Sequence, residues 1–92
     1  MKINFQDILF IEGLDDYVKI YIQGSKPVLS LMSMKSLCDR LPKEEFMRVH
    51  RSFIVPLAHI LSIRNRRIYI DQREIPIGET YYNTIKEWLA KR

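Results

Sequence analysis

The chain has 92 residues, enough for one domain with a modest core, and its 47% of hydrophobic residues argues against a disordered protein. It has no apolar run of membrane-spanning length and no signal-peptide pattern, and its single cysteine excludes an internal disulfide. We therefore expect a cytoplasmic protein that has no membrane partner.

The charge is distributed unevenly along the chain. Residues 1–46 contain six Lys or Arg against seven Asp or Glu, a net charge of −1. Residues 47–92 contain nine against four, a net charge of +5. This asymmetry favours a polyanionic partner for the second half. The alternative is a soluble protein whose surface is mildly basic.

Three strands are predicted near the N-terminus. Ile8–Glu12 is largely a continuous apolar run, typical of a strand buried on both faces, and Gly13–Asp16 has the composition of a turn. Tyr17–Ile22 alternates between apolar and polar residues, as a half-buried strand does. After a second turn, Val28–Leu31 is the third strand.

A short helix is predicted next. Ser33 can cap its first turn, and Pro42 ends it. Four apolar residues at positions i, i+3, i+4 and i+7 give it one apolar face: Met34, Leu37, Cys38 and Leu41. We therefore expect Cys38 to pack in the core rather than to act as a reactive thiol.

The stretch Phe46–Pro56 begins with the alternation of a strand, but the pattern then fails. Arg51 falls where the next core side chain should lie, and a charge on a buried face is costly unless it is paired. We therefore predict that His50–Ser52 leaves the sheet and presents polar atoms at the surface. Arg offers a rigid fork of donors suited to phosphates and to guanine edges. The alternative is an exposed strand end with solvated side chains.

Three more strands are predicted in the second half, at Ile60–Ile63, Ile68–Ile70 and Glu74–Ile77. Turns at Arg64–Arg67 and Asp71–Arg73 separate them. The regular alternation of short strands and turns is typical of antiparallel hairpins.

A C-terminal helix closes the chain. Gly78 ends the last strand, and Thr80 can cap the helix. Its apolar stripe consists of Tyr81, Ile85, Trp88 and Leu89, and we expect Trp88 in the core. The whole pattern predicts a mostly β fold: compact antiparallel sheets with one short central helix and a C-terminal helix.

The sequence gives little support for an enzyme or a cofactor site. His50 and His59 lack the spacing of a metal-binding pair, and no Gly-rich phosphate loop, Ser-centred elbow or CxxC motif is present. Adjacent residues of a strand point to opposite faces, so Asp15 and Asp16 are a poor acid–base pair, and we expect them in a solvated turn. We expect no catalysis, no metal and no cofactor.

From Asp7 to about Leu89 the chain resembles the LytTR family, the DNA-binding output domain of many bacterial two-component response regulators. Three segments carry the resemblance: Asp7–Glu12 with Asp16–Ile20, Phe46–Val55, and Ile75–Tyr81. Phe-Met-Arg-Val-His-Arg-Ser-Phe-Ile-Val is the most specific of them. The resemblance implies a mostly β fold that binds double-stranded DNA through edge loops, which enter successive major grooves.

Carried over by position, the first loop ends at Asp16 and Tyr17, the second is His50–Ser52, and the third is Gly78–Tyr81. Arg51 is expected to contact a base edge, while Arg48 and Lys19 contact phosphates. The residues expected to contact DNA are Asp16, Tyr17, Lys19, Arg48, His50, Arg51, Ser52, Gly78, Thr80 and Tyr81.

Two features depart from the family pattern. Where many members have a basic third loop, this chain has Glu79, which would repel phosphate, and Asp15 and Asp16 oppose backbone binding in the first loop. Arg64, Arg66 and Arg67 are basic enough to help, but the sequence leaves open whether they lie on the same edge as the loops.

The resemblance also suggests partners. Residues 1–92 are expected to form a single LytTR-like domain without a receiver domain. The chain is then either the excised output part of a full-length regulator that carries a receiver domain, or a stand-alone regulator. Family members commonly bind paired direct repeats, which suggests a second copy on DNA. The alternatives are a small β module that binds a protein through an edge strand, and a domain that stacks single-stranded RNA on exposed tyrosines.

Overall fold

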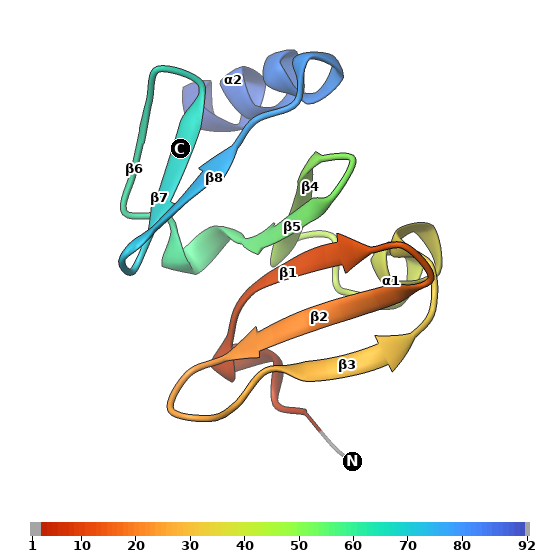
Figure 1. Cartoon of the computed structure of the whole chain (residues 1–92). Helices are drawn as coiled ribbons and strands as arrows, with labels where there is room; N and C mark the ends of the chain where they lie inside the picture. The colour runs from red at the N-terminus through yellow and green to blue at the C-terminus, as the bar shows by residue number, and fades with distance from the viewer. Residues whose placement is uncertain (1–2, 92) are drawn as a thin grey trace.

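The computed structural model describes residues 3–91 and has a small mixed architecture dominated by strands (Figure 1). Short 3-10 turns occur at Phe5–Asp7, Leu57–His59 and Glu79–Tyr81. The strands are β1 (Ile8–Leu14), β2 (Tyr17–Ile22), β3 (Val28–Leu31), β4 (Phe46–His50), β5 (Phe53–Pro56), β6 (Ser62–Arg64), β7 (Arg67–Ile70) and β8 (Arg73–Pro76). The helices are α1 (Met34–Arg40) and α2 (Tyr82–Ala90).

The strands form two antiparallel sheets. The larger has the order β3-β2-β1-β5-β4, and the smaller has the order β6-β7-β8. Each link is a hairpin except β1 with β5, where Ile11 pairs with Ile54. The predicted fold class, with its short central helix and its C-terminal helix, is confirmed.

Strand β1 lies between two hydrophobic cores, which explains its continuous apolar run. Ile11 has no exposed surface and packs with Leu37 and Leu41 in the core beneath α1. Phe10 points to the other face, where it packs with Ile68 of the smaller sheet and Ile85 of α2. The prediction of a strand buried on both faces is therefore confirmed.

The first core also accounts for the apolar face of α1. Leu37 and Leu41 are buried, and Met34 and Cys38 are half-buried against the same cluster, so Cys38 packs as expected. The N-cap prediction is confirmed as well, because the Ser33 hydroxyl accepts a hydrogen bond from the backbone N–H of Ser36 at 3.0 Å.

Replacing Ser33 by alanine should lower the free energy of unfolding by about 1 kcal/mol, because one N–H of the first turn of α1 loses its acceptor. Urea unfolding followed by circular dichroism measures this. The Ser33→Asp variant should keep most of the stability, since a carboxylate accepts the same hydrogen bond. Equal losses in both variants would contradict a capping role.

The predicted bounds of four strands, β1, β6, β7 and β8, are wrong. β7 begins at Arg67 rather than Ile68, and β8 is Arg73–Pro76 rather than Glu74–Ile77. β1 extends through Gly13 and Leu14, which pair with β2, so the turn shrinks to Asp15 and Asp16. Asp15 adopts a φ of 53°, a conformation that aspartate tolerates better than most residues. β6 begins at Ser62 rather than Ile60, because a 3-10 turn precedes it.

The predicted start of the last helix is also wrong. Thr80 lies inside the 3-10 turn Glu79–Tyr81, and Tyr81 occupies the N-cap of α2 without a capping hydrogen bond from its side chain. The apolar face consequently shifts by one residue, and Tyr82 packs against the second core in place of Tyr81. Trp88 is half-buried and Leu89 is 39% exposed.

Candidate nucleic-acid interface

Three connections that are far apart in the sequence meet at one edge of the molecule. They are the first loop (residues 14–17, the turn from β1 to β2 with one strand residue on each side), the second loop (His50–Ser52, the last residue of β4 and the turn to β5) and the third loop (Gly78–Tyr81, before α2). Figure 1 shows them along the right-hand side. We call these three segments together the loop edge.

Two backbone hydrogen bonds hold the loops together. The N–H of Gly13, just before the first loop, donates to the carbonyl of Ser52 at 2.8 Å. The N–H of Gly78 donates to the carbonyl of Val49 at 2.8 Å. The second loop is therefore fixed on both sides, which brings the predicted loop residues into one surface.

The second loop presents Arg51 to solvent, as the failed alternation predicted. The pairing of β4 with β5 is irregular between Arg48 and His50, and Arg51 and Ser52 form the turn. The Nδ1 atom of His50 accepts a hydrogen bond from the N–H of Ser52 at 3.0 Å. In a neutral imidazole this leaves the proton on Nε2, which is a donor.

Arg48 is half-buried, and its guanidinium faces backbone carbonyls of the second loop. Its Nη2 donates to the carbonyl of Arg51 at 2.6 Å, and its Nε lies 3.4 Å from the carbonyl of His50. The guanidinium carbon also lies 6.0 Å from the centre of the Tyr81 ring. Arg48 therefore links the second loop to the third, a contact that its place on the polar face of a strand did not reveal.

Gly78 allows the third loop to approach the second. Its φ of −69° is accessible to any residue, so conformation does not require a glycine here. A Cβ atom at this position, however, would lie 3.0 Å from the Tyr81 ring and 3.3 Å from the Cα of His50. A larger side chain at this position therefore requires the Tyr81 ring or the His50 backbone to shift by a few tenths of an ångström.

Replacing Gly78 by alanine should lower the free energy of unfolding by about 1 kcal/mol and weaken DNA binding, because the third loop must move away from His50. Urea unfolding and a duplex titration measure the two effects. The control is Gly24→Asn, where no atom lies within 4 Å and asparagine tolerates the φ of 71°. Unchanged stability and affinity in Gly78→Ala would show that the contact is not tight.

The remaining predicted residues differ in exposure. Tyr17 is 47% exposed, and Asp16 and Thr80 are exposed at the loop edge. Lys19 is half-buried: it lies opposite Glu12 in the pairing of β1 with β2, and its Nζ is 5.1 Å from the centre of the Tyr21 ring. Lys19 therefore lies on the face of the sheet rather than in a loop.

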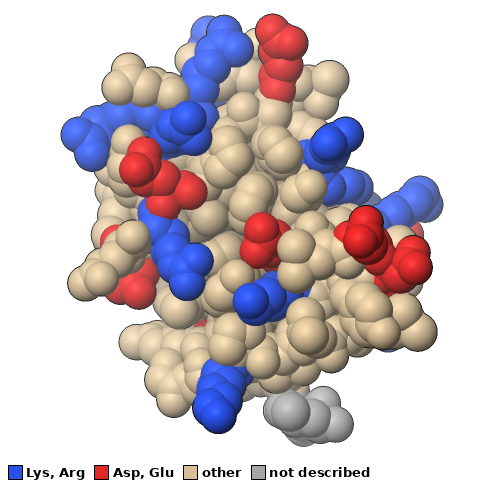
Figure 2. All heavy atoms as spheres, viewed as in Figure 1, with Lys and Arg blue, Asp and Glu red and all other residues tan. Residues whose placement is uncertain are grey.

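The loop edge has mixed charge. Exposed Asp15, Asp16 and Glu79 accompany the exposed Arg51, and Figure 2 shows acidic and basic side chains interspersed along this side. The predicted departures from the family pattern thus lie at the surface, where they act on any ligand of the loops.

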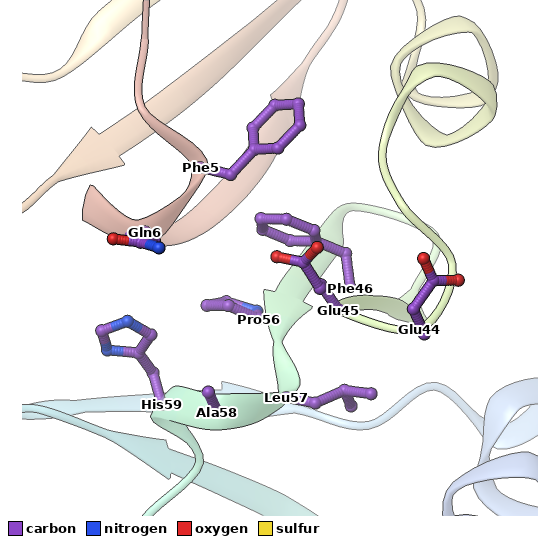
Figure 3. Close-up of a pocket in the computed structure, with 9 residues that line it drawn as sticks. All are labelled: Phe5, Gln6, Glu44, Glu45, Phe46, Pro56, Leu57, Ala58 and His59. Carbon is purple, nitrogen blue, oxygen red and sulfur yellow. The ribbon is translucent and has the colours of Figure 1, made fainter.

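A hollow of about 200 Å³ lies away from the loop edge, at the opposite ends of β4 and β5 (Figure 3). Phe46 and Pro56 line it together with the acidic residues Glu44 and Glu45 and with His59. It is smaller than the pockets that usually hold drug-sized ligands. None of the residues predicted to contact DNA lines it.

Two further observations concern residues 3–91. No helix there is long and apolar enough to cross a membrane. No group of three or more His, Cys, Asp or Glu is placed to hold a metal ion there.

Comparisons with known proteins identify the family. The family model of the LytTr DNA-binding domain matches residues 1–90. The sensory transduction proteins LytT of Bacillus cereus and Bacillus anthracis are each 30% identical to the chain over 93 residues. The CO-responsive transcriptional regulator RcoM of Rhodospirillum rubrum is 28% identical over 90 residues.

The alignments cover 95% of this chain for LytT and 90% for RcoM, but only 37% and 38% of those relatives. A solved LytTr DNA-binding domain, from a Bacillus cereus protein described as a methyl-accepting/DNA response regulator, superposes with a TM-score of 0.84. It covers 97% of this chain and 86% of its own, at 23% identity, and so supports the fold. Because the family model covers residues 1–90, the chain belongs to the LytTr family of DNA-binding domains.

Proposed function

We propose that the chain recognises a specific sequence in double-stranded DNA by placing the loop edge in the major groove. The observation that carries this proposal is the position of Arg51, exposed at the tip of a loop that its two neighbours hold in place. A guanidinium fork can bond both O6 and N7 of guanine. A loop that is already ordered loses less entropy when it binds.

The other predicted residues support Arg51 in different ways. His50 donates from Nε2, and Ser52 offers a hydroxyl on the same loop. Tyr17 and Thr80 are exposed hydroxyl donors in the first and third loops, and they bond phosphate oxygens on the two sides of the second loop. Arg48 positions the second loop, because its donors are directed to the carbonyls of His50 and Arg51.

The same proposal extends to the full-length protein. The 92 residues act as one DNA-binding domain, the output part of a cytoplasmic response regulator whose receiver domain lies elsewhere in a longer chain. Two copies bind direct repeats, each through its own loop edge. The support is the family membership and the greater length of the LytT and RcoM relatives.

Selection from a random duplex library with the isolated domain tests the proposal. We expect enrichment of one motif, whose repeat spacing gives the number of copies bound, and an affinity that falls steeply as salt rises. Equal or tighter binding to single strands would favour an RNA-binding domain. Failure to bind any nucleic acid would favour a protein-binding module and would refute the proposal.

A further inference from the structure

The loop edge lacks the positive charge that DNA binding requires. Its exposed charged residues are three acids, Asp15, Asp16 and Glu79, against the single cation Arg51, while Arg48 is directed to backbone carbonyls. Nonspecific attraction to DNA comes from Lys and Arg next to phosphates. Cations outside the three loops must therefore supply most of it.

The turn between β6 and β7 is close enough to do so. The N–H of Ile77 donates to the carbonyl of Arg66 at 3.0 Å, and the next N–H, that of Gly78, donates to Val49. The start of the third loop thus lies between this turn and β4. Strand neighbours are about 4.8 Å apart, so the backbones of Arg66 and Val49 are separated by roughly 10 Å.

Arg66 and Lys86 gather on one aromatic ring at this place. The guanidinium carbon of Arg66 lies 4.4 Å from the centre of the Tyr82 ring, and the Nζ of Lys86 lies 5.5 Å from the same centre. Both cations are exposed. Figure 2 shows Lys and Arg side chains, with Asp and Glu side chains among them, at the top and upper left of the view, where Figure 1 places this turn and α2.

No carboxylate within residues 3–91 forms an ion pair with either cation. The ion pairs there are Lys35 with Asp39 and Arg67 with Glu74. Arg67 is thus partly neutralised, whereas Arg66 and Lys86 are two like charges on one ring. A nearby phosphate lowers the repulsion between these two positive charges, and each cation can keep its contact with the ring.

We propose that Arg66 and Lys86, held by Tyr82, form a phosphate clamp that grips the DNA backbone beside the groove entered by the third loop. This inference rests on the proposed DNA-binding function and extends it to a fourth segment of the chain. The clamp supplies affinity without reading bases, so it compensates for the acidic residues of the loop edge.

The test is a double variant, Arg66→Asn with Lys86→Gln, titrated with the selected duplex over a range of salt concentrations. Asparagine suits the φ of 60° at Arg66, so the turn keeps its conformation. Two lost phosphate contacts should lower the magnitude of the slope of log K against log salt by about 1.8. At 0.1 M salt this corresponds to roughly 60-fold weaker binding, and the difference from the parent shrinks as salt rises.

The matched control is Lys26→Gln with Lys43→Gln, which removes the same charge from exposed sites before β3 and before β4. Its slope of log K against log salt should differ from the parent's by less than about 0.5, which is less than the change expected for one phosphate contact. An equal fall in both double variants would mean that only net charge matters and would overturn the clamp. An unchanged slope in the first variant, or an altered preferred sequence, would also overturn it. If the parent selects no duplex at all, it is the proposed DNA-binding function that fails instead.

Discussion

Replacing Arg51 by alanine should reduce the preference of the domain for its selected base pair by about 1–3 kcal/mol, a factor of roughly 5 to 150. The reason is geometric. Arg51 lies exposed at the tip of the second loop, and the truncated side chain leaves the O6 and N7 acceptors of guanine without their partner. Competition titrations with duplexes that differ at single positions measure the change.

The conservative variant Arg51→Lys distinguishes base reading from charge. Lysine retains the positive charge but lacks the planar fork, so the variant should keep most of the nonspecific affinity and lose most of the discrimination. Arg40→Ala is the matched control, because it removes an exposed arginine from the last turn of α1, outside the loop edge. If Arg51→Ala keeps the parent's base preference at every position of the site, Arg51 does not read a base.

The exposure of Arg51 could be predicted because it follows from a local pattern, the alternation of residues along a strand. A strand of period two places alternate residues on the core face, and Arg51 violates that pattern in a stretch otherwise rich in apolar residues. The structure satisfies the pattern with an irregular pairing before His50 and a turn at Arg51 and Ser52. The strands β2 and β3 were predicted with their observed bounds for the same reason.

The contacts between the loops could not be predicted, because they join residues that no local pattern relates. The extension of β1 to Leu14 accompanies a hydrogen bond from the N–H of Gly13 to the carbonyl of Ser52, in the turn between β4 and β5 much later in the chain. The position of Arg66 beside the third loop follows from the pairing of β7 with β8, which places it opposite Ile77. Neither composition nor spacing contains this information.

Arg48 illustrates the same limit at a single side chain. Its place on the polar face, two residues before His50, fits a phosphate contact and a contact to its own loop equally well. The observed bonds to the carbonyls of His50 and Arg51 favour the second role. A rigid fork that bridges two carbonyls also explains why an arginine serves here better than a lysine.

Replacing Arg48 by methionine should therefore lower the free energy of unfolding by about 1–3 kcal/mol, because two carbonyls of the second loop lose a charged donor. The methionine keeps most of the aliphatic packing, so the loss reports the hydrogen bonds. Urea unfolding measures it. DNA affinity should also fall, because the loop that contains Arg51 loses the hydrogen bonds that fix its conformation.

The salt dependence separates the two possible roles of Arg48. A positioning residue makes no phosphate contact, so the slope of log K against log salt should be unchanged in Arg48→Met. Loss of one phosphate contact would instead reduce it by about 0.9. Arg48→Lys completes the test: it preserves the charge but cannot bridge both carbonyls, so it should resemble the methionine variant. Recovery of the parent affinity by lysine would show that charge alone acts at this position and that the loop does not depend on the fork.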